Sequence, residues 1–136
     1  MQAQRDSAAA GAFGALAVVR WLLMIALAVA GAIHLFMGLW ELGVADQSAS
    51  FYVINVAIGL APALAYATAV VLALTGRGGR AIWSVLLACG VVLCAIDLFY
   101  LVTVGFGELM VAPPCLVALS LVQLLSRPRL SAAEAQ

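Results

Sequence analysis

Four long apolar runs, separated by short stretches rich in polar residues and glycine, dominate the chain. A helix that crosses a membrane needs about 20 predominantly apolar residues, and each run approaches or exceeds that length. The pattern predicts an all-α fold in which a four-transmembrane-helix bundle forms a single domain, 20–126. The expected spans are about 21–40, 52–75, 81–104 and 109–126.

The composition agrees with a polytopic membrane protein. Of the 136 residues, 67% are hydrophobic and only 9% are charged, whereas an ordinary soluble domain is about half apolar and about a quarter charged. These values exclude a soluble globular enzyme and a disordered chain. Six arginines balance six acidic residues and lysine is absent, so nucleic acid is not an expected partner. The expected partners are the lipid bilayer and either other membrane subunits or a second copy of the chain.

The arginines predict how the chain is threaded. In a four-span arrangement all six lie on one side, and basic residues near span ends mark the cytoplasmic side. Both the N-terminal segment 1–19 and the tail 127–136 are therefore expected in the cytoplasm, and the protein in the inner (cell) membrane as a multi-pass protein. The arginines on that side are Arg5, Arg20, Arg77, Arg80, Arg127 and Arg129.

Aromatic residues near the span ends predict the membrane interfaces. Tryptophan and tyrosine gather at the level of the lipid headgroups, so we expect Trp21 and Trp83 at the inner interface and Trp40 and Tyr52 at the outer one. The segment 1–19 is rich in alanine and weakly polar, and we expect it to be frayed or to lie along the interface. The first apolar run is too long for an ordinary signal peptide, so we expect it to be retained.

Two ionisable residues stand out inside the predicted spans. A carboxylate at the centre of a membrane helix costs roughly 2.5–3.5 kcal/mol on insertion scales, so Asp97 should face protein or water rather than lipid. His34 follows Trp21 by thirteen residues, and Asp97 follows Trp83 by fourteen. At ~1.5 Å per residue each lies ~20 Å above the inner interface. Because their helices run in the same direction, we expect His34 and Asp97 at one level.

Three further polar residues complete the candidate cluster. Glu41 lies on the same helical stripe as His34, Asn55 lies near the outer end of the second span, and Tyr100 follows Asp97 by three residues. The cluster has two interpretations. Its members can hold the helices together through hydrogen bonds, or they can handle a proton, an ion or a small molecule; an interface with another subunit is a third reading.

Small residues recur on the same stripes as these polar groups. Membrane helices approach closely where glycine and alanine face one another. We therefore expect helix packing at Ala30, Gly38, Gly59 and Gly90.

The sequence lacks the motifs of a catalytic or metal site. Cys89, Cys94 and Cys115 lie inside spans without a Cys-x-x-Cys pair, and a lone histidine excludes bis-histidine haem ligation within one copy. No nucleophile motif or metal-protease motif is present. We expect that the chain binds no metal ion and is not an enzyme that acts alone. Quinone is the one cofactor that the polar cluster could bind.

Two short segments resemble each other, and one resembles a known family. Segments 32–37 and 95–100 share four of six residues, with His34 aligned with Asp97, which suggests a duplicated helical hairpin.

The segment 31–35 (Gly-Ala-Ile-His-Leu), in a four-span chain of this length, resembles DoxX-like small membrane proteins. That resemblance implies a four-helix membrane protein, and some members are membrane subunits of quinone-linked sulfur oxidation complexes.

These observations lead to two expected functions. The first is a non-catalytic accessory subunit or a homo-oligomeric bundle with a buried polar cluster. The second is a proton-coupled small-molecule carrier, or a quinone-pocket subunit of a membrane redox complex. Replacing Asp97 and His34 by neutral isosteres separates them, because the second function requires a group that titrates or bonds a quinone carbonyl.

Overall fold

The computed structural model describes residues 2–43, 49–104 and 111–126, and these residues form helices without any strand. The helices are α1 (Gln2–Gly43), α2 (Ala49–Thr75), α3 (Arg80–Val104) and α4 (Ala112–Ser126). The predicted all-α fold is thus confirmed. Two helices contain stretches long and apolar enough to cross a membrane, namely Gly14–Trp40 in α1 and Arg80–Thr103 in α3. Shorter apolar stretches are Gly59–Thr75 in α2 and Ala112–Ser126 in α4.

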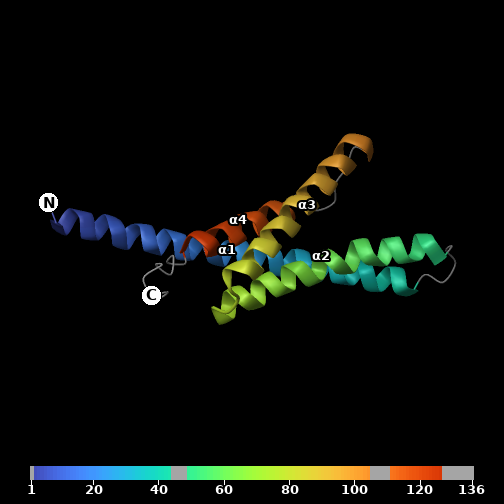
Figure 1. Cartoon of the computed structure of the whole chain (residues 1–136), viewed down its shortest axis with the longest axis horizontal. Helices are drawn as coiled ribbons and strands as arrows, with labels where there is room; N and C mark the ends of the chain where they lie inside the picture. Colours follow the sequence, from blue (N-terminus) through green and yellow to red (C-terminus); the bar gives the residue numbers. More distant parts are fainter. Residues whose placement is uncertain (1, 44–48, 105–110, 127–136) are drawn as a thin grey trace, which may run out of the picture.

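The first helix is much longer than the expected span. It begins at Gln2 and continues without a break through the segment 1–19 into the apolar run. Alanine has the highest helix propensity of all residues, and the alanines of this segment extend the helix where we expected a frayed end. In Figure 1 the first part of α1 projects beyond the other helices.

Glycines and prolines set the ends of the shorter helices. Gly76 and Gly78 adopt φ values of 66° and 95°, in the left-handed region that favours glycine, and they reverse the chain between α2 and α3. The carbonyl of Gly79 then accepts a hydrogen bond from the amide of Trp83 as α3 begins. In α4, Pro113 and Pro114 occupy the first turn, where a missing amide donor costs nothing.

The helices pack as two antiparallel pairs. α1 lies along α2, α3 lies along α4, and α1 also contacts α4. α2 touches α3 and α4 over a short distance, whereas α1 and α3 make no direct backbone contact in the described part of the chain. α1 and α3 are therefore diagonal to each other. Figure 1 shows α3 starting beside the end of α2 and then diverging from the α1–α2 pair along its length.

The core lies in the half of the bundle nearest the α2–α3 turn. Its largest fully buried side chains are Trp83, Tyr66, Leu27, Leu116 and Leu119. Trp83, which we expected at the membrane interface, is 0% exposed and packs inside the bundle, while its depth relative to a membrane stays a prediction. Trp83 shares a helical stripe with Leu86 and Gly90, and all three are buried. Trp21, by contrast, is 56% exposed.

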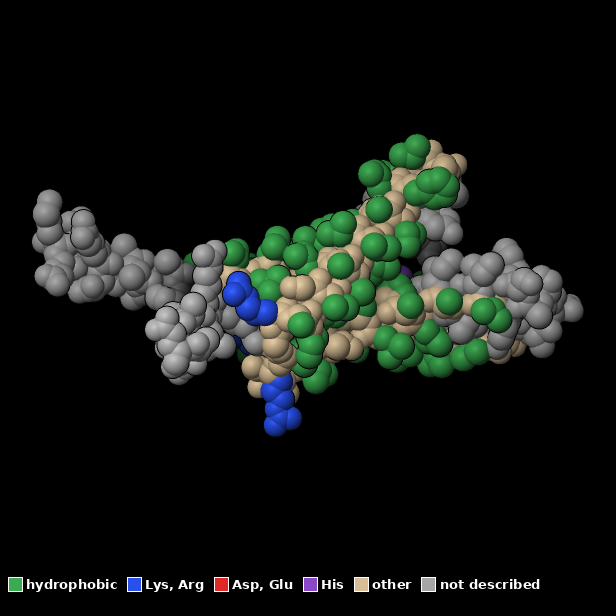
Figure 2. Space-filling view, viewed as in Figure 1, with side chains coloured by type: hydrophobic (Ala, Val, Ile, Leu, Met, Phe, Trp, Pro, Cys, Tyr) green, Lys and Arg blue, Asp and Glu red, His purple; other side chains and the backbone are tan. Residues whose placement is uncertain are grey.

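The outer surface of the bundle is apolar. Large hydrophobic side chains project outward along α1 and α3, and Figure 2 shows them covering the outer half of α3. The hydroxyls of Thr75, Thr103 and Ser126 each donate to the carbonyl four residues earlier in their own helix. Such bonds are a common way for serine and threonine hydroxyls to be satisfied within a helix.

Candidate functional site

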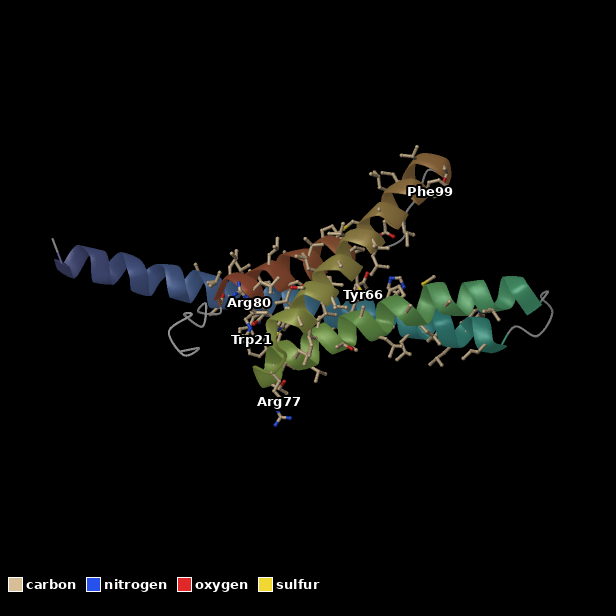
Figure 3. All side chains as sticks on the ribbon, in the orientation of Figure 1. Trp21, Tyr66, Arg77, Arg80 and Phe99 are labelled. Carbon is tan, nitrogen blue, oxygen red and sulfur yellow. The ribbon has the colours of Figure 1, made fainter. Side chains whose placement is uncertain are left out.

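Tyr66 lies at the centre of the candidate site. Its side chain, on α2, is only 1% exposed, and Figure 3 places it where α3 separates from α2. On one side it meets His34 of α1, with ring centroids 5.7 Å apart and ring planes at 60°. This edge-to-face arrangement is one that aromatic pairs prefer. Tyr66 therefore holds the imidazole against the interior of the bundle.

Asp97 approaches the same tyrosine from α3. Its half-buried side chain lies close enough to interact electrostatically with both His34 and Tyr66. Because α1 and α3 do not touch directly, these two ionisable residues meet across the bundle, with Tyr66 of α2 between their helices. We call His34, Tyr66 and Asp97 the central cluster.

Two cysteines border the central cluster. Cys94 of α3, one turn before Asp97, and Cys115 of α4 lie in the neighbourhood of Tyr66. Both are free thiols with partly covered side chains. Residues of all four helices thus lie near Tyr66.

The side chains of Glu41, Asn55 and Tyr100, which the sequence analysis placed in the cluster, lie outside the described residues. Their backbones belong to α1, α2 and α3 respectively.

Close glycine packing fixes the level at which α1 meets α2. A Cβ atom placed on Gly59 would lie 2.7 Å from the Cα and 2.9 Å from the backbone nitrogen of Gly38. It would also lie 3.4 Å from the carbonyl oxygen of His34. Gly38 follows His34 by one helical turn and Gly59 precedes Tyr66 by two, so this contact sets the depth at which His34 meets Tyr66.

The other small residues assigned to helix packing are also buried. Gly90 lies against α4, where an added Cβ would come within 2.9 Å of the Val117 side chain and 3.2 Å of its backbone nitrogen. Ala30 belongs to the buried core on α1. The two helix pairs are therefore each joined through a glycine.

A second set of buried polar groups lies near the end of the bundle that carries the α2–α3 turn, and most of it was not predicted from the sequence. Ser120 and Gln123 of α4 are buried, and the Ser120 Oγ and Gln123 Nε2 atoms have no hydrogen-bond partner among the described residues. The same holds for Trp83 Nε1. The signal for Gln123 was present, since it is the single amide side chain of the predicted fourth span and follows Ser120 by three residues.

Arg20 links the apolar stretch of α1 to the end of α2. Its guanidinium donates a hydrogen bond to the backbone carbonyl of Ala73. Ala73 is among the last four residues of α2, whose carbonyls have no helical partner. A cation is favourable at this position because the C-terminus of a helix carries partial negative charge.

The central cluster offers proton transfer and hydrogen bonding as its chemistry. It combines one carboxyl, one imidazole and one phenol, which are groups that exchange protons or bond a polar ligand. The described residues include no group of three or more histidine, cysteine or acidic side chains placed to hold a metal ion.

No family model, curated protein or solved structure matches the chain. The resemblance of the segment 31–35 to DoxX-like proteins therefore stays a prediction.

Proposed function

We propose that the chain spans the inner membrane four times with both termini in the cytoplasm. The arrangement of the arginines supports this topology. Figure 3 shows Trp21, Arg77 and Arg80 at one end of the bundle, and Arg20 lies at that end through its bond to Ala73. A single basic end is typical of a cytoplasmic membrane interface.

Within that topology, we propose that the protein is a non-catalytic accessory subunit or a homo-oligomeric bundle. The observation that carries this proposal is the separation of the outer half of α3 from the α1–α2 pair (Figure 1). Phe99 and Val102 on this part of α3 are 65% and 77% exposed. Asp97 lies on the opposite face of the same stretch, directed toward His34 and Tyr66.

An incomplete bundle explains why a partner is needed. Lipid can cover Phe99 and Val102, because both are apolar, but lipid is a poor neighbour for the half-buried carboxyl of Asp97. A helix from another subunit, packed beside Asp97 on α3, would shield Asp97 and add packing contacts. Helices associate in membranes through such packing and through interhelical hydrogen bonds.

The test is the size of the complex isolated from native membranes in a mild detergent. We expect the chain, of 14.0 kDa, to migrate with other subunits or as an oligomer. A cysteine at Leu101, one turn after Asp97 on the same face of α3, should then form cross-links to a neighbour, whereas one at Val102, on the opposite face, should not. A solitary monomer without cross-links at either position would contradict the proposal.

The central cluster supports a second candidate function, a proton-coupled carrier or a quinone-pocket subunit. His34 and Asp97 meet at one tyrosine within the membrane, and ionisable residues there commonly mark proton or substrate pathways. A quinone would be held by hydrogen bonds to its carbonyl oxygens. The DoxX-like resemblance points in the same direction, because some members of that family serve quinone-linked complexes.

Neutral substitutions distinguish the two functions. The variants are Asp97→Asn, His34→Gln and the combination of the two. If the accessory-subunit proposal holds, we expect the free energies of unfolding to give a coupling free energy between the two positions of about 0.6–2 kcal/mol, as for hydrogen bonds between membrane helices. The measurement is unfolding in mixed micelles by a double-mutant cycle. A carrier or quinone subunit would instead lose transport or electron transfer at unchanged stability, and the accessory-subunit proposal would then give way to the second function.

A further inference from the structure

Two hollows lie end to end along the seam between α1 and α2. The larger, with a volume of about 420 Å³, has a wholly apolar residue lining that includes Leu27, Gly31, Leu35, Ala63 and Val71. The smaller, of about 180 Å³, lies nearer the inner end and is lined by Ala17, Arg20, Trp21, Met24 and Leu74.

The two hollows occupy one face of each helix. On α1, Ala17, Arg20, Met24, Leu27 and Gly31 follow one another at spacings of three or four residues, so they lie on a single stripe. On α2, the smaller hollow's Leu74 lies three residues beyond Val71 of the larger one. The two hollows therefore lie along the same side of the α1–α2 pair, with Arg20 at one end and a wholly apolar lining at the other. We call the two hollows together the α1–α2 groove.

From this groove we infer that the protein binds an anionic phospholipid of the cytoplasmic leaflet, with the phosphate at Arg20 and one acyl chain along the apolar interior. The inference rests on the proposed topology, which places Arg20 at the cytoplasmic interface. From Arg20 to Leu35 the groove extends over ~22 Å at ~1.5 Å per residue. It therefore runs from the headgroup level into the hydrocarbon core, which is about 30 Å thick.

Charge complementarity favours an anionic phospholipid over an apolar helix as the occupant of the groove. The groove begins at a guanidinium, which has five N–H donors. One nitrogen donates to the Ala73 carbonyl, while the buried Nε has no partner among the described residues. Arginine binds phosphate oxygens through such forked donors. Trp21 lies beside it and is half exposed, as is typical of a tryptophan at the headgroup level.

Quenching of tryptophan fluorescence by brominated phospholipids tests the inference. The full chain carries Trp40→Phe, so that Trp21 reports on the groove while the fully buried Trp83 contributes a constant background. The vesicles contain either brominated phosphatidylglycerol or brominated phosphatidylcholine. We expect phosphatidylglycerol to be preferred about fivefold, the effect of one basic side chain at an anionic surface.

Two arginine variants provide a matched comparison. Arg20→Gln should abolish the preference, whereas Arg80→Gln, which removes the same charge from an exposed position at the same end of the bundle, should retain it. An equal preference in both variants, or no preference in the parent chain, would overturn the inference.

A second pair of variants tests the apolar part of the groove without touching Arg20. Ala32 lines the groove, and Ala32→Phe should reduce the phospholipid that co-purifies in native mass spectrometry. The neighbouring Ile33, which is exposed but does not line the groove, provides the control variant Ile33→Phe. Equal lipid retention by both variants would contradict the inference. So would a loss of dimer in Ala32→Phe at unchanged lipid content, because the groove would then hold a second copy of the chain.

The same vesicles separate failure of this inference from failure of the proposed topology. Resistance to carbonate extraction shows whether the chain is inserted. An inserted chain that is quenched equally by both lipids overturns the lipid site and leaves the four-span proposal standing. A chain that does not insert overturns both.

Discussion

Gly59→Ala is expected to force α1 and α2 apart and to destabilise the bundle by about 1–3 kcal/mol, the usual cost of overpacking. The added methyl group would lie 2.7 Å from the Cα and 2.9 Å from the nitrogen of Gly38. These are backbone atoms, so no side-chain rotation relieves the clash. Since Gly38 follows His34 by one turn, the shift should also move His34 away from Tyr66.

A second glycine of α1 provides the control for this prediction. Gly14 has nothing within 4 Å of its Cβ position, so Gly14→Ala should be neutral or should stabilise the helix by up to about 1 kcal/mol. Unfolding of both variants in mixed micelles measures the difference. Equal stability of Gly59→Ala and Gly14→Ala would show that α1 and α2 do not meet at Gly38 and Gly59.

Trp83→Ala is expected to have the largest effect of any single substitution, a loss of about 3–5 kcal/mol in the free energy of unfolding. Trp83 is fully buried in the core. Inside a membrane, helix association depends on van der Waals packing and hydrogen bonding more than on exclusion of water, so an empty volume there removes the contacts that join the helices. Trp83→Phe should recover part of the loss.

The exposed Trp21 is the matched control for Trp83. Trp21→Ala removes the same side chain from a position that packs on little of the protein, and its effect should stay within about 0.5 kcal/mol. If the two alanine variants lose equal stability, or if Trp83 is quenched by lipid-borne bromine, then Trp83 does not pack inside the bundle.

Length and periodicity predicted the helices well, because a run of apolar residues of membrane length can satisfy its backbone only as a helix. They could not predict the direction in which Trp83 points. A position near the end of a span indicates depth, whereas the stripe of Trp83, Leu86 and Gly90 indicates the face that packs on other helices. The position of Trp83 near a span end predicted its depth, but it did not predict that the side chain is buried among the helices.

The candidate site was predicted in part. Equal depth suggested that His34 and Asp97 could meet, and the structure brings them together electrostatically. The sequence did not show that α1 and α3 are diagonal, so the place of Tyr66 between them was missed. Spacing within one helix is readable from sequence, but the order of helices around a bundle depends on long-range packing.

The inner polar groups were missed for a different physical reason. Arg20 was interpreted only as a topological charge, yet its bond to the Ala73 carbonyl joins residues 53 apart. Gln123 is polar in the middle of an apolar run, and its burial depends on the neighbours that α4 acquires in the bundle. The Arg20 contact leaves no local pattern in the chain, whereas the position of Gln123 within an apolar run was a signal that was not used.

The four-span topology is the central claim, and labelling of single cysteines in intact cells tests it most directly. The three native cysteines are first replaced by alanine. Single cysteines are then placed at exposed helix ends and in the α2–α3 turn, at Gly43, Gly79, Thr103 and Ser126. A maleimide that cannot cross the membrane reports which of these positions face the outside.

We expect labelling of Gly43→Cys and Thr103→Cys in intact cells. We expect labelling of Gly79→Cys and Ser126→Cys only after the membrane has been opened. Labelling of Gly79→Cys from outside, or identical labelling of all four positions, would contradict the threading on which the proposed function and the lipid site both rest.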